Sequence, residues 1–237
     1  MTGVNQVLRK EKKFLLGRRE FYSLKGKLDQ CLYRDPHNGP MGYAVRSLYF
    51  DTIYDKDYFE KLEGVELRRK IRLRCYSPDA GFAMLEIKQK QGDTQLKRSL
   101  RVERDDAIRL AKGDYSPLLG YSGDQETFAL ECYGLMNRLC YFPKTIVEYQ
   151  RMAYIAKENK IRITFDQNII STESCMDLFS PALLMNPVID PSFVVLEVKY
   201  NNFLLSYIQQ MLNYVDRSEV SVSKYYLARQ NAYRTHL

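Results

Sequence analysis

The sequence predicts an α+β protein built around an antiparallel β-sheet, and three observations lead to this prediction. Several short segments alternate apolar and charged residues, which is the pattern of strands with one buried face. Short turn sequences, at residues 77–81 and 157–159, separate neighbouring strand candidates and favour hairpins. Other segments space their apolar residues as helices do. No repeat or domain boundary is evident, so residues 1–237 are expected to form one domain.

The first half of the chain begins with a lead-in, followed by a strand and a helix. Phe21, Leu24 and Leu28 stand at helical spacing in the segment 18–32, and a loop rich in Pro and Gly follows it. A second, short helix is expected at residues 55–62. The strands expected in this half are residues 9–16, 43–51, 68–76, 82–90 and 96–102.

The second half begins with a helix from Asp105 to about Gly113, because acidic residues favour a helix N-terminus. An amphipathic helix is expected at 125–141, where Pro143 ends it. The strands expected in this half are residues 145–156, 160–166 and 193–200, and residues 167–192 are expected to be irregular. The last segment, 203–233, has a helical pattern with a break near residues 216–219, and Val222, Tyr226 and Leu227 are expected to face the core.

The stretch of residues 68–90 shows the strand alternation most clearly, as two runs joined by a turn. Because strand side chains alternate between faces, one face of this hairpin is apolar and the other is charged. The charged face carries Lys70, Arg72, Arg74, Glu86, Lys88 and Lys90. The same alternation places further charged residues on one face of other strands, namely Glu11, Lys13, Arg151, Arg162, Asp166, Glu197 and Lys199. In the segment 96–102 the charged side is ambiguous, because Lys97 and Arg101 oppose Arg98.

This repetition has two interpretations. For one hairpin alone, a charged face exposed to solvent is the simpler one. If the sheet closes into a barrel, however, the apolar faces pack outward under helices and the charged faces line a lumen. A lumen rich in Arg and Lys needs an anion, because like charges repel and their desolvation is costly. The sequence therefore favours a polyanion ligand, with the Glu residues holding a metal or balancing charge.

Composition excludes several classes of function. A net charge of +7 favours an anionic partner. The five cysteines form no C-x-x-C pair, which argues against a zinc site or a disulfide framework. Neither of the two histidines, His37 and His236, stands where a catalytic base is expected. No apolar run is long enough for a membrane span and no signal-peptide pattern opens the chain, so a cytoplasmic location is expected.

A family resemblance follows from nine short motifs that occur in order along nearly the whole chain. They are R-K-E-K-K-F, S-L-Y-F-D, R-L-R-C-Y, L-E-I-K-Q-K, K-R-S-L, V-E-Y-Q-R-M-A-Y, I-R-I-T-F-D, L-E-V-K-Y and V-S-K-Y-Y-L. Each motif is weak by itself, but the ordered set is specific. The chain resembles the VTC catalytic domain, the polyphosphate polymerase module of the triphosphate tunnel metalloenzyme (CYTH-like) superfamily. The resemblance implies a closed antiparallel eight-stranded β-barrel with flanking helices.

The resemblance also implies roles for individual residues. The phosphate-binding set is Lys13, Arg72, Arg74, Lys88, Lys90, Arg98, Arg151, Arg162, Lys199 and Lys224. The residues implied to act in catalysis are Arg72, Arg74, Lys88, Arg151, Arg162 and Glu197. Glu197 is the implied metal ligand, with Glu11 and Glu86 at further acidic positions. The metal is expected to be Mn²⁺ or Mg²⁺, which take oxygen ligands.

The reaction that the resemblance implies is transfer of the γ-phosphate of a nucleoside triphosphate to inorganic polyphosphate. Related triphosphatases carry E-x-E-x-K on the first strand, whereas this chain has Arg9 before Glu11 and Lys13. That departure favours the polymerase branch over a two-metal hydrolase. Membrane helices and the regulatory SPX domain of eukaryotic VTC proteins have no counterpart in the sequence, which leaves a membrane partner open.

Three alternatives stay open at the level of sequence. One is a metal-dependent tripolyphosphatase or organic triphosphatase, and another is a non-catalytic polyphosphate-binding module. Structural ion pairs are an alternative role for Glu197 and for Arg151 and Arg162, the latter two with Glu148 or Asp166 as partners. Nucleic-acid binding is disfavoured, because the basic residues alternate along strands and no recognition-helix motif is present. The sequence leaves the oligomeric state, the nucleotide and the product chain length undetermined.

Overall fold

The computed structural model describes residues 9–91, 94–213 and 223–235. Its centre is one antiparallel sheet whose main path has the order β1-β10-β8-β7-β3-β4-β5-β6. Two short strands lie off this path, β2 on β7 and β9 on β8. The strands are β1 (Arg9–Gly17), β2 (Tyr33–Arg34), β3 (Tyr43–Thr52), β4 (Leu67–Cys75), β5 (Phe82–Gln91), β6 (Thr94–Glu103), β7 (Tyr141–Ala156), β8 (Ile161–Thr172), β9 (Asn186–Pro187) and β10 (Phe193–Asn201). The predicted α+β class with an antiparallel sheet is therefore confirmed.

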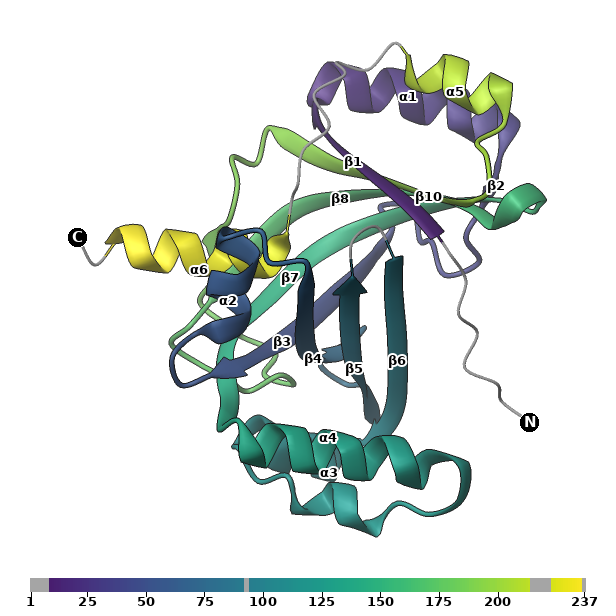
Figure 1. The fold of residues 1–237 in the computed structure, drawn as a ribbon. Coiled ribbons are helices and arrows are strands. Elements are labelled where there is room, and N and C mark those ends of the chain that lie inside the picture. Colours follow the sequence, from purple (N-terminus) through teal and green to yellow (C-terminus); the bar gives the residue numbers. More distant parts are fainter. Residues whose placement is uncertain (1–8, 92–93, 214–222, 236–237) are drawn as a thin grey trace.

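Helices lie in three groups around this sheet (Figure 1). They are α1 (Arg18–Cys31), α2 (Lys56–Leu62), α3 (Arg104–Ala111), α4 (Glu126–Arg138), α5 (Ser206–Leu212) and α6 (Lys224–Thr235). Short 3₁₀ turns occupy Ser116–Gly120, Gly123–Gln125 and Glu158–Lys160. None of the helices in the described part of the chain combines the length and the apolarity needed to cross a membrane.

The sheet does not form the closed eight-stranded barrel that was expected. The main path has eight strands, but β2 and β9 bring the sheet to ten. Its first and last strands, β1 and β6, lie in contact, yet no ladder of backbone hydrogen bonds joins them among the described residues. The sheet therefore curls until its two edges meet without closing through its backbone.

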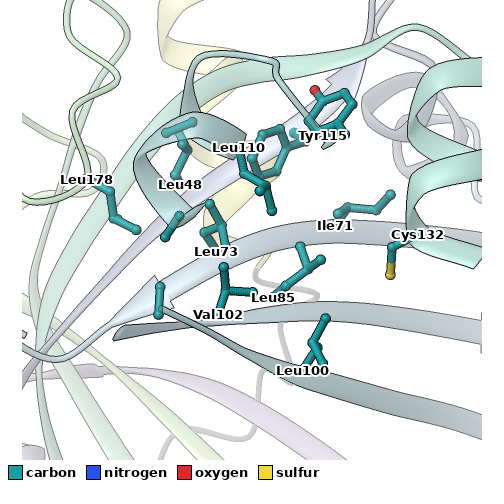
Figure 2. Packing of buried hydrophobic residues seen from close by; sticks show 14 of the residues in the cluster. Leu48, Ile71, Leu73, Leu85, Leu100, Val102, Leu110, Tyr115, Cys132 and Leu178 are labelled. Carbon is teal, nitrogen blue, oxygen red and sulfur yellow. The ribbon is translucent and has the colours of Figure 1, made fainter. Parts of the chain in front are cut away.

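The outer face of strands β3 to β6 is covered by α3 and α4. Leu48, Ile71, Leu73 and Leu85 are fully buried in this cluster (Figure 2). For the last three residues this is what the alternation in residues 68–90 predicts. The helices add Leu110 and, from α4, residues such as Cys132. At about 25 cal/mol per Å², burial of each such side chain contributes roughly 1.5–3 kcal/mol. This cluster fixes which face of β4 and β5 is turned away from the helices.

A second apolar cluster lies on the outer face of β1, β10, β8 and β7, where α1 and α5 cover it (Figure 1). Leu16, Leu28 and Phe165 are fully buried there, and the rings of Phe21 and Phe165 meet edge to face. Glu20 caps α1, because its carboxylate accepts a hydrogen bond of 2.8 Å from the backbone N–H of Gly17. Both ends of the sheet path are thus apolar on their outer side.

The third cluster lies on the opposite face of the sheet, where α6 packs against β3 and β7. Tyr225 of α6 is buried and stacks on Tyr49, and Tyr226 stacks on Tyr58 of α2. The tyrosine-rich end of the chain is therefore core packing. Tyr225 also donates a 2.5 Å hydrogen bond to the buried carboxylate of Asp51. These contacts set where α6 begins, and hence the place of Lys224.

Several element boundaries differ from the sequence prediction. Helix α4 ends at Arg138 rather than at residue 141, because Cys140 adopts a positive φ of 50° and the chain turns directly into β7. Pro143 therefore lies inside a strand. β8 continues to Thr172, and β9 lies in the segment that was expected to be irregular. The helix break near residues 216–219, and Val222, lie outside the described residues.

Candidate functional site

One face of the sheet, which we call the charged face, carries most of the cations that the sequence pattern singles out. Its residues on β4 and β5 are register partners: Arg72 lies opposite Glu86, and Lys70 lies opposite Lys88. On the other side of the sheet path, Lys13 lies opposite Glu197 between β1 and β10. The two halves interact across the curl of the sheet, because the charges of β1 and β10 shift the pKa of Lys88 on β5. The charged face is therefore the inner face.

Glu86 is the centre of the first group of ion pairs on this face. Its carboxylate accepts hydrogen bonds of 2.7 Å from Arg72 Nε and from Lys97 Nζ, and Arg74 lies 3.8 Å away. Arg72 and Arg74 are only 7% and 9% exposed, so both cations are held away from bulk water. Burial raises the pKa of Glu86, but the charges of Arg72, Arg74 and Lys97 outweigh burial and hold it well below its usual value. Arg72 also donates a 3.0 Å hydrogen bond to the hydroxyl of Tyr49.

Two carboxylates and two lysines form the second group, on the neighbouring strands β1 and β10. Lys13 lies 2.7 Å from Glu11 and 3.8 Å from Glu197. Lys199 pairs with Glu197 and lies 3.5 Å from Glu11. Burial raises the pKa of Glu197, but Lys199 and Lys13 together lower it well below its usual value. Both carboxylates are therefore ionised at neutral pH.

Asp166 of β8 is the centre of the third group and is fully buried. It accepts two hydrogen bonds from Arg151, of 2.7 and 2.8 Å, and Lys224 at the start of α6 lies 2.5 Å away. Burial raises the pKa of Asp166, but Arg151 and Lys224 lower it to about 2. This group joins the N-terminal turn of α6 to the charged face. Lys224 thus faces the site, as the family resemblance implies.

Lys70 and Lys88 are half-buried and differ from the other cations on this face. Among the described residues, no carboxylate lies within ion-pair distance of either amine. Burial and the charge of Lys13 together lower the pKa of Lys70 to about 7, while its Nζ donates a 2.5 Å hydrogen bond to Ser223. Burial and the charge of Arg72 likewise lower the pKa of Lys88 well below its usual value. An anion bound between them would favour the charged form of both amines.

Arg162 lies at the rim of the charged face rather than among its buried cations. It pairs with Asp35 at 2.7 Å and donates a 3.0 Å hydrogen bond to the hydroxyl of Tyr43. Lys90 lies on the same face of β5 as Lys88, opposite Arg68. Both residues can extend a row of phosphate contacts beyond the buried centre.

Arg98 does not join this site, and the expectation that it binds phosphate is not supported by its position. It lies on the helix-covered face of β6, where its guanidinium pairs with Glu131 of α4 and covers the ring of Phe128 at 5.0 Å. Lys97, its neighbour in the chain, takes the inward place and pairs with Glu86. The physical reason is the register between β5 and β6, in which Lys97 is the partner of Lys88.

Glu11 and Glu197 fit a divalent cation better than Glu86 does. Mg²⁺ and Mn²⁺ sites in phosphate-binding proteins use one or two carboxylates together with phosphate oxygens and water. Glu11 has one buried carboxylate oxygen, Oε2, that accepts no hydrogen bond. Burial and the charge of Glu197 raise the pKa of Glu11, but Lys13, Lys199 and Lys88 outweigh them and lower it below its usual value. Glu86 is committed to Arg72, Arg74 and Lys97. Among the described residues, no group of three or more His, Cys, Asp or Glu side chains gathers at one point.

Sequence reasoning missed or undervalued three residues of the site. Lys70 shows the same alternation as Arg72, so the signal for it was present in the sequence. Lys97 could not be distinguished from Arg98 without the strand register. Asp166 was considered only as a partner of Arg151 or Arg162, whereas it holds Arg151 and Lys224 together. The predicted alternative of a structural ion pair is met for Arg151 with Asp166. Arg162 pairs instead with Asp35, a partner that the sequence reasoning did not name.

Two solved structures share this fold. A proposed adenylyl cyclase from Hippeastrum, described as having a dominant triphosphatase activity, is 13% identical with a TM-score of 0.54, covering 94% of this chain and 96% of its own. A proposed adenylate cyclase from Bacillus halodurans is also 13% identical, with a TM-score of 0.52, and the match covers 91% of this chain and 95% of its own. No curated protein matches the chain.

The curled antiparallel sheet with its basic inner face defines the class, which is an α+β fold shared with these two solved structures. Within that class, the chain belongs to the VTC domain family, whose model matches residues 8–233.

Proposed function

We propose that this protein is a polyphosphate polymerase-like phosphotransferase. It transfers the γ-phosphate of a nucleoside triphosphate to the end of an inorganic polyphosphate chain, which lies along the charged face. The observation that carries this proposal is the pair of half-buried lysines, Lys70 and Lys88, which lie beside a row of Arg side chains and have no carboxylate partner in the described part of the chain. Membership of the VTC domain family supports it.

The spacing of the cations suits a phosphate chain. On one face of a strand, residues at i and i+2 are about 6–7 Å apart. Arg72 and Arg74 are such a pair, and Lys70 and Lys88 extend the row on two strands. Arg binds phosphate through two parallel hydrogen bonds and keeps its charge at any working pH. Successive or alternate phosphates can therefore each meet a cation.

The chemistry requires no nucleophile from the protein. A terminal oxygen of the polyphosphate chain forms the new bond to the γ-phosphorus, and the bond from that phosphorus to the β–γ bridging oxygen breaks. The nucleoside diphosphate leaves with the bridging oxygen. Arg72, Arg74 and Arg151 neutralise the charge that spreads over the transferred group and hold it in line. When bound at Glu11 and Glu197, Mn²⁺ or Mg²⁺ would supply further charge neutralisation.

A hydrolase is the second candidate, because the Hippeastrum protein that shares this fold is described as a triphosphatase. In that case water replaces the polyphosphate chain as acceptor. Both carboxylates that could orient such a water, Glu11 and Glu197, are paired with lysines. That pairing favours charge neutralisation over activation of water, and hence the polymerase.

The test is incubation of the protein with ATP, Mn²⁺ and a short polyphosphate primer, with ADP, free phosphate and chain length measured together. We expect ADP to form with longer chains and little free phosphate. Free phosphate released in proportion to ADP, without chain growth, would establish a triphosphatase. Tight binding of tripolyphosphate without any turnover would leave only a polyphosphate-binding module.

We further propose that residues 1–237 act as one domain in the cytoplasm.

A further inference from the structure

The row of cations on β4 ends in an aromatic ring. Lys70, Arg72 and Arg74 occupy alternate positions on the charged face, and Tyr76 is the next residue in that alternation. It follows Cys75, where β4 ends. Tyr76 is the first residue after the strand, and its ring contacts that of Tyr43 on β3. A ligand that follows this row therefore passes from guanidinium groups to a ring.

Tyr76 belongs to a small group of rings at this rim. Its ring centroid lies 6.1 Å from that of Tyr43, and the ring of His37 lies 6.4 Å from Tyr43 on a loop that precedes β3. The interplanar angles are 57° and 63°, so neither ring is stacked face to face on Tyr43. Tyr76 is 48% exposed and the His37 side chain 84%. Ring surface is thus available to a further flat group.

Polar contacts tie His37 and Tyr43 to Arg162 at the rim of the charged face. Asp35 is buried and lies 2.7 Å from Arg162 through one oxygen. Its other oxygen accepts a 3.0 Å hydrogen bond from the backbone N–H of His37 and lies 2.8 Å from His37 Nδ1. Arg162 in turn bonds the hydroxyl of Tyr43 at 3.0 Å. His37, Tyr43 and Arg162 are therefore held together at the rim, and Tyr76 joins them through its ring contact with Tyr43.

The other end of the same row has a different character. Lys70 starts the row, and the residues whose charges act on it are Lys13, Lys61, Arg68 and Arg72. An end surrounded by cations suits the anionic part of a ligand. The end at Tyr76 suits a part that is flat and uncharged. The charged face is thus asymmetric along β4, and a nucleoside triphosphate has the same asymmetry.

We propose that the rings of Tyr76 and His37 form a platform for the nucleobase of the nucleoside triphosphate, while Arg162 contacts the phosphate nearest to the sugar. The proposal rests on the proposed function for its choice of a nucleotide. It names a binding site for the base and fixes the direction in which the triphosphate lies on the charged face. Stacking on aromatic side chains tolerates any base, so the platform discriminates nucleotide from inorganic triphosphate rather than one base from another.

The test compares a non-hydrolysable ATP analogue, adenylyl imidodiphosphate, with inorganic tripolyphosphate, each titrated calorimetrically in the presence of Mn²⁺. The variants are Tyr76→Ala, Tyr76→Phe and a control, Tyr54→Ala, at a tyrosine that is 84% exposed outside the platform. Because base stacking is lost, Tyr76→Ala should lower the affinity for the ATP analogue by about tenfold. Tripolyphosphate affinity should change by less than about twofold, since its phosphates do not need the ring. Tyr76→Phe and Tyr54→Ala should match the wild type for both ligands.

Two results would overturn the proposed platform. One is an equal loss of affinity for both ligands in Tyr76→Ala, and the other is no loss of affinity for the ATP analogue. The outcome is independent of the reaction. If the selective loss appears but no chains form in the assay above, the proposed reaction fails and the platform stands. If Tyr76→Ala makes chains from ATP with an unchanged KM, the platform fails and the reaction stands.

Discussion

Replacing Asp166 with Asn tests whether the carboxylates on the charged face are there to balance buried cations. Asp166 is fully buried, and its partners Arg151 and Lys224 have side chains that are only 12% and 10% exposed. Removing one member of a buried ion pair costs about 3–5 kcal/mol, because the remaining charge is left uncompensated. For a chain of this size each kcal/mol lowers Tm by roughly 2–4 °C, so Asp166→Asn should unfold about 10 °C below the wild type.

The assay is thermal unfolding at pH 7 with and without tripolyphosphate. Glu131→Gln is the matched control, because Glu131 pairs with Arg98 on the outer face, where it is 42% exposed, and its loss should cost less than about 1 kcal/mol. Tripolyphosphate should raise the Tm of Asp166→Asn more than that of the wild type, since it supplies the missing negative charge. If Asp166→Asn unfolds too readily to measure, the double variant with Arg151→Met should recover part of the loss. If Asp166→Asn lowers Tm by no more than Glu131→Gln does, the reasoning is refuted.

Three further predictions concern phosphate binding and turnover. Arg72→Ala should lower kcat for chain synthesis by about 100-fold, whereas Arg98→Ala should leave kcat within about threefold of the wild type. Equal losses of kcat for the two variants in steady-state kinetics would contradict the assignment of Arg72 to the inner face and Arg98 to the outer face. Because only protonated Lys70 attracts phosphate, and its pKa is lowered to about 7, affinity for tripolyphosphate should fall between pH 6.5 and pH 8.5 more steeply in the wild type than in Lys70→Met. Between about pH 7 and about pH 10, Lys70 binds more protons in the unfolded chain than in the folded protein, so it should make folding stability rise with pH. This pH dependence is opposite in sign to that of tripolyphosphate affinity. Glu197→Gln should abolish the dependence of turnover on Mn²⁺ concentration while tripolyphosphate still binds in EDTA, and a retained Mn²⁺ dependence would exclude Glu197 as a ligand.

Local patterns in the sequence were enough to predict most of the charged face. The alternation in residues 68–90 separates Ile71 and Leu73 from Arg72 and Arg74, and the structure buries the first pair under α3 and α4. A period of two residues is a local property, so no knowledge of distant partners is needed to assign these faces.

The remaining errors depend on contacts between distant parts of the chain. Arg98 was assigned to the phosphate site because its strand offers cations on both faces, and the register of β6 on β5 decides between them. Glu131 of α4 then pairs with Arg98 on the outer face. The role of Asp166 depends on Lys224, which α6 brings to it from the far end of the sequence. The expected closure of the barrel depends on whether β1 and β6 pair, which no local pattern encodes.

The most direct measurement for the whole account is a crystal structure of the protein with adenylyl imidodiphosphate and Mn²⁺. The account predicts phosphates on the charged face, in contact with Arg72, Arg74 and Lys88, and the metal on Glu197. Phosphates bound on the outer surface, with the ion pairs of Glu86 and Asp166 unchanged and the charged face free of ligand, would contradict it.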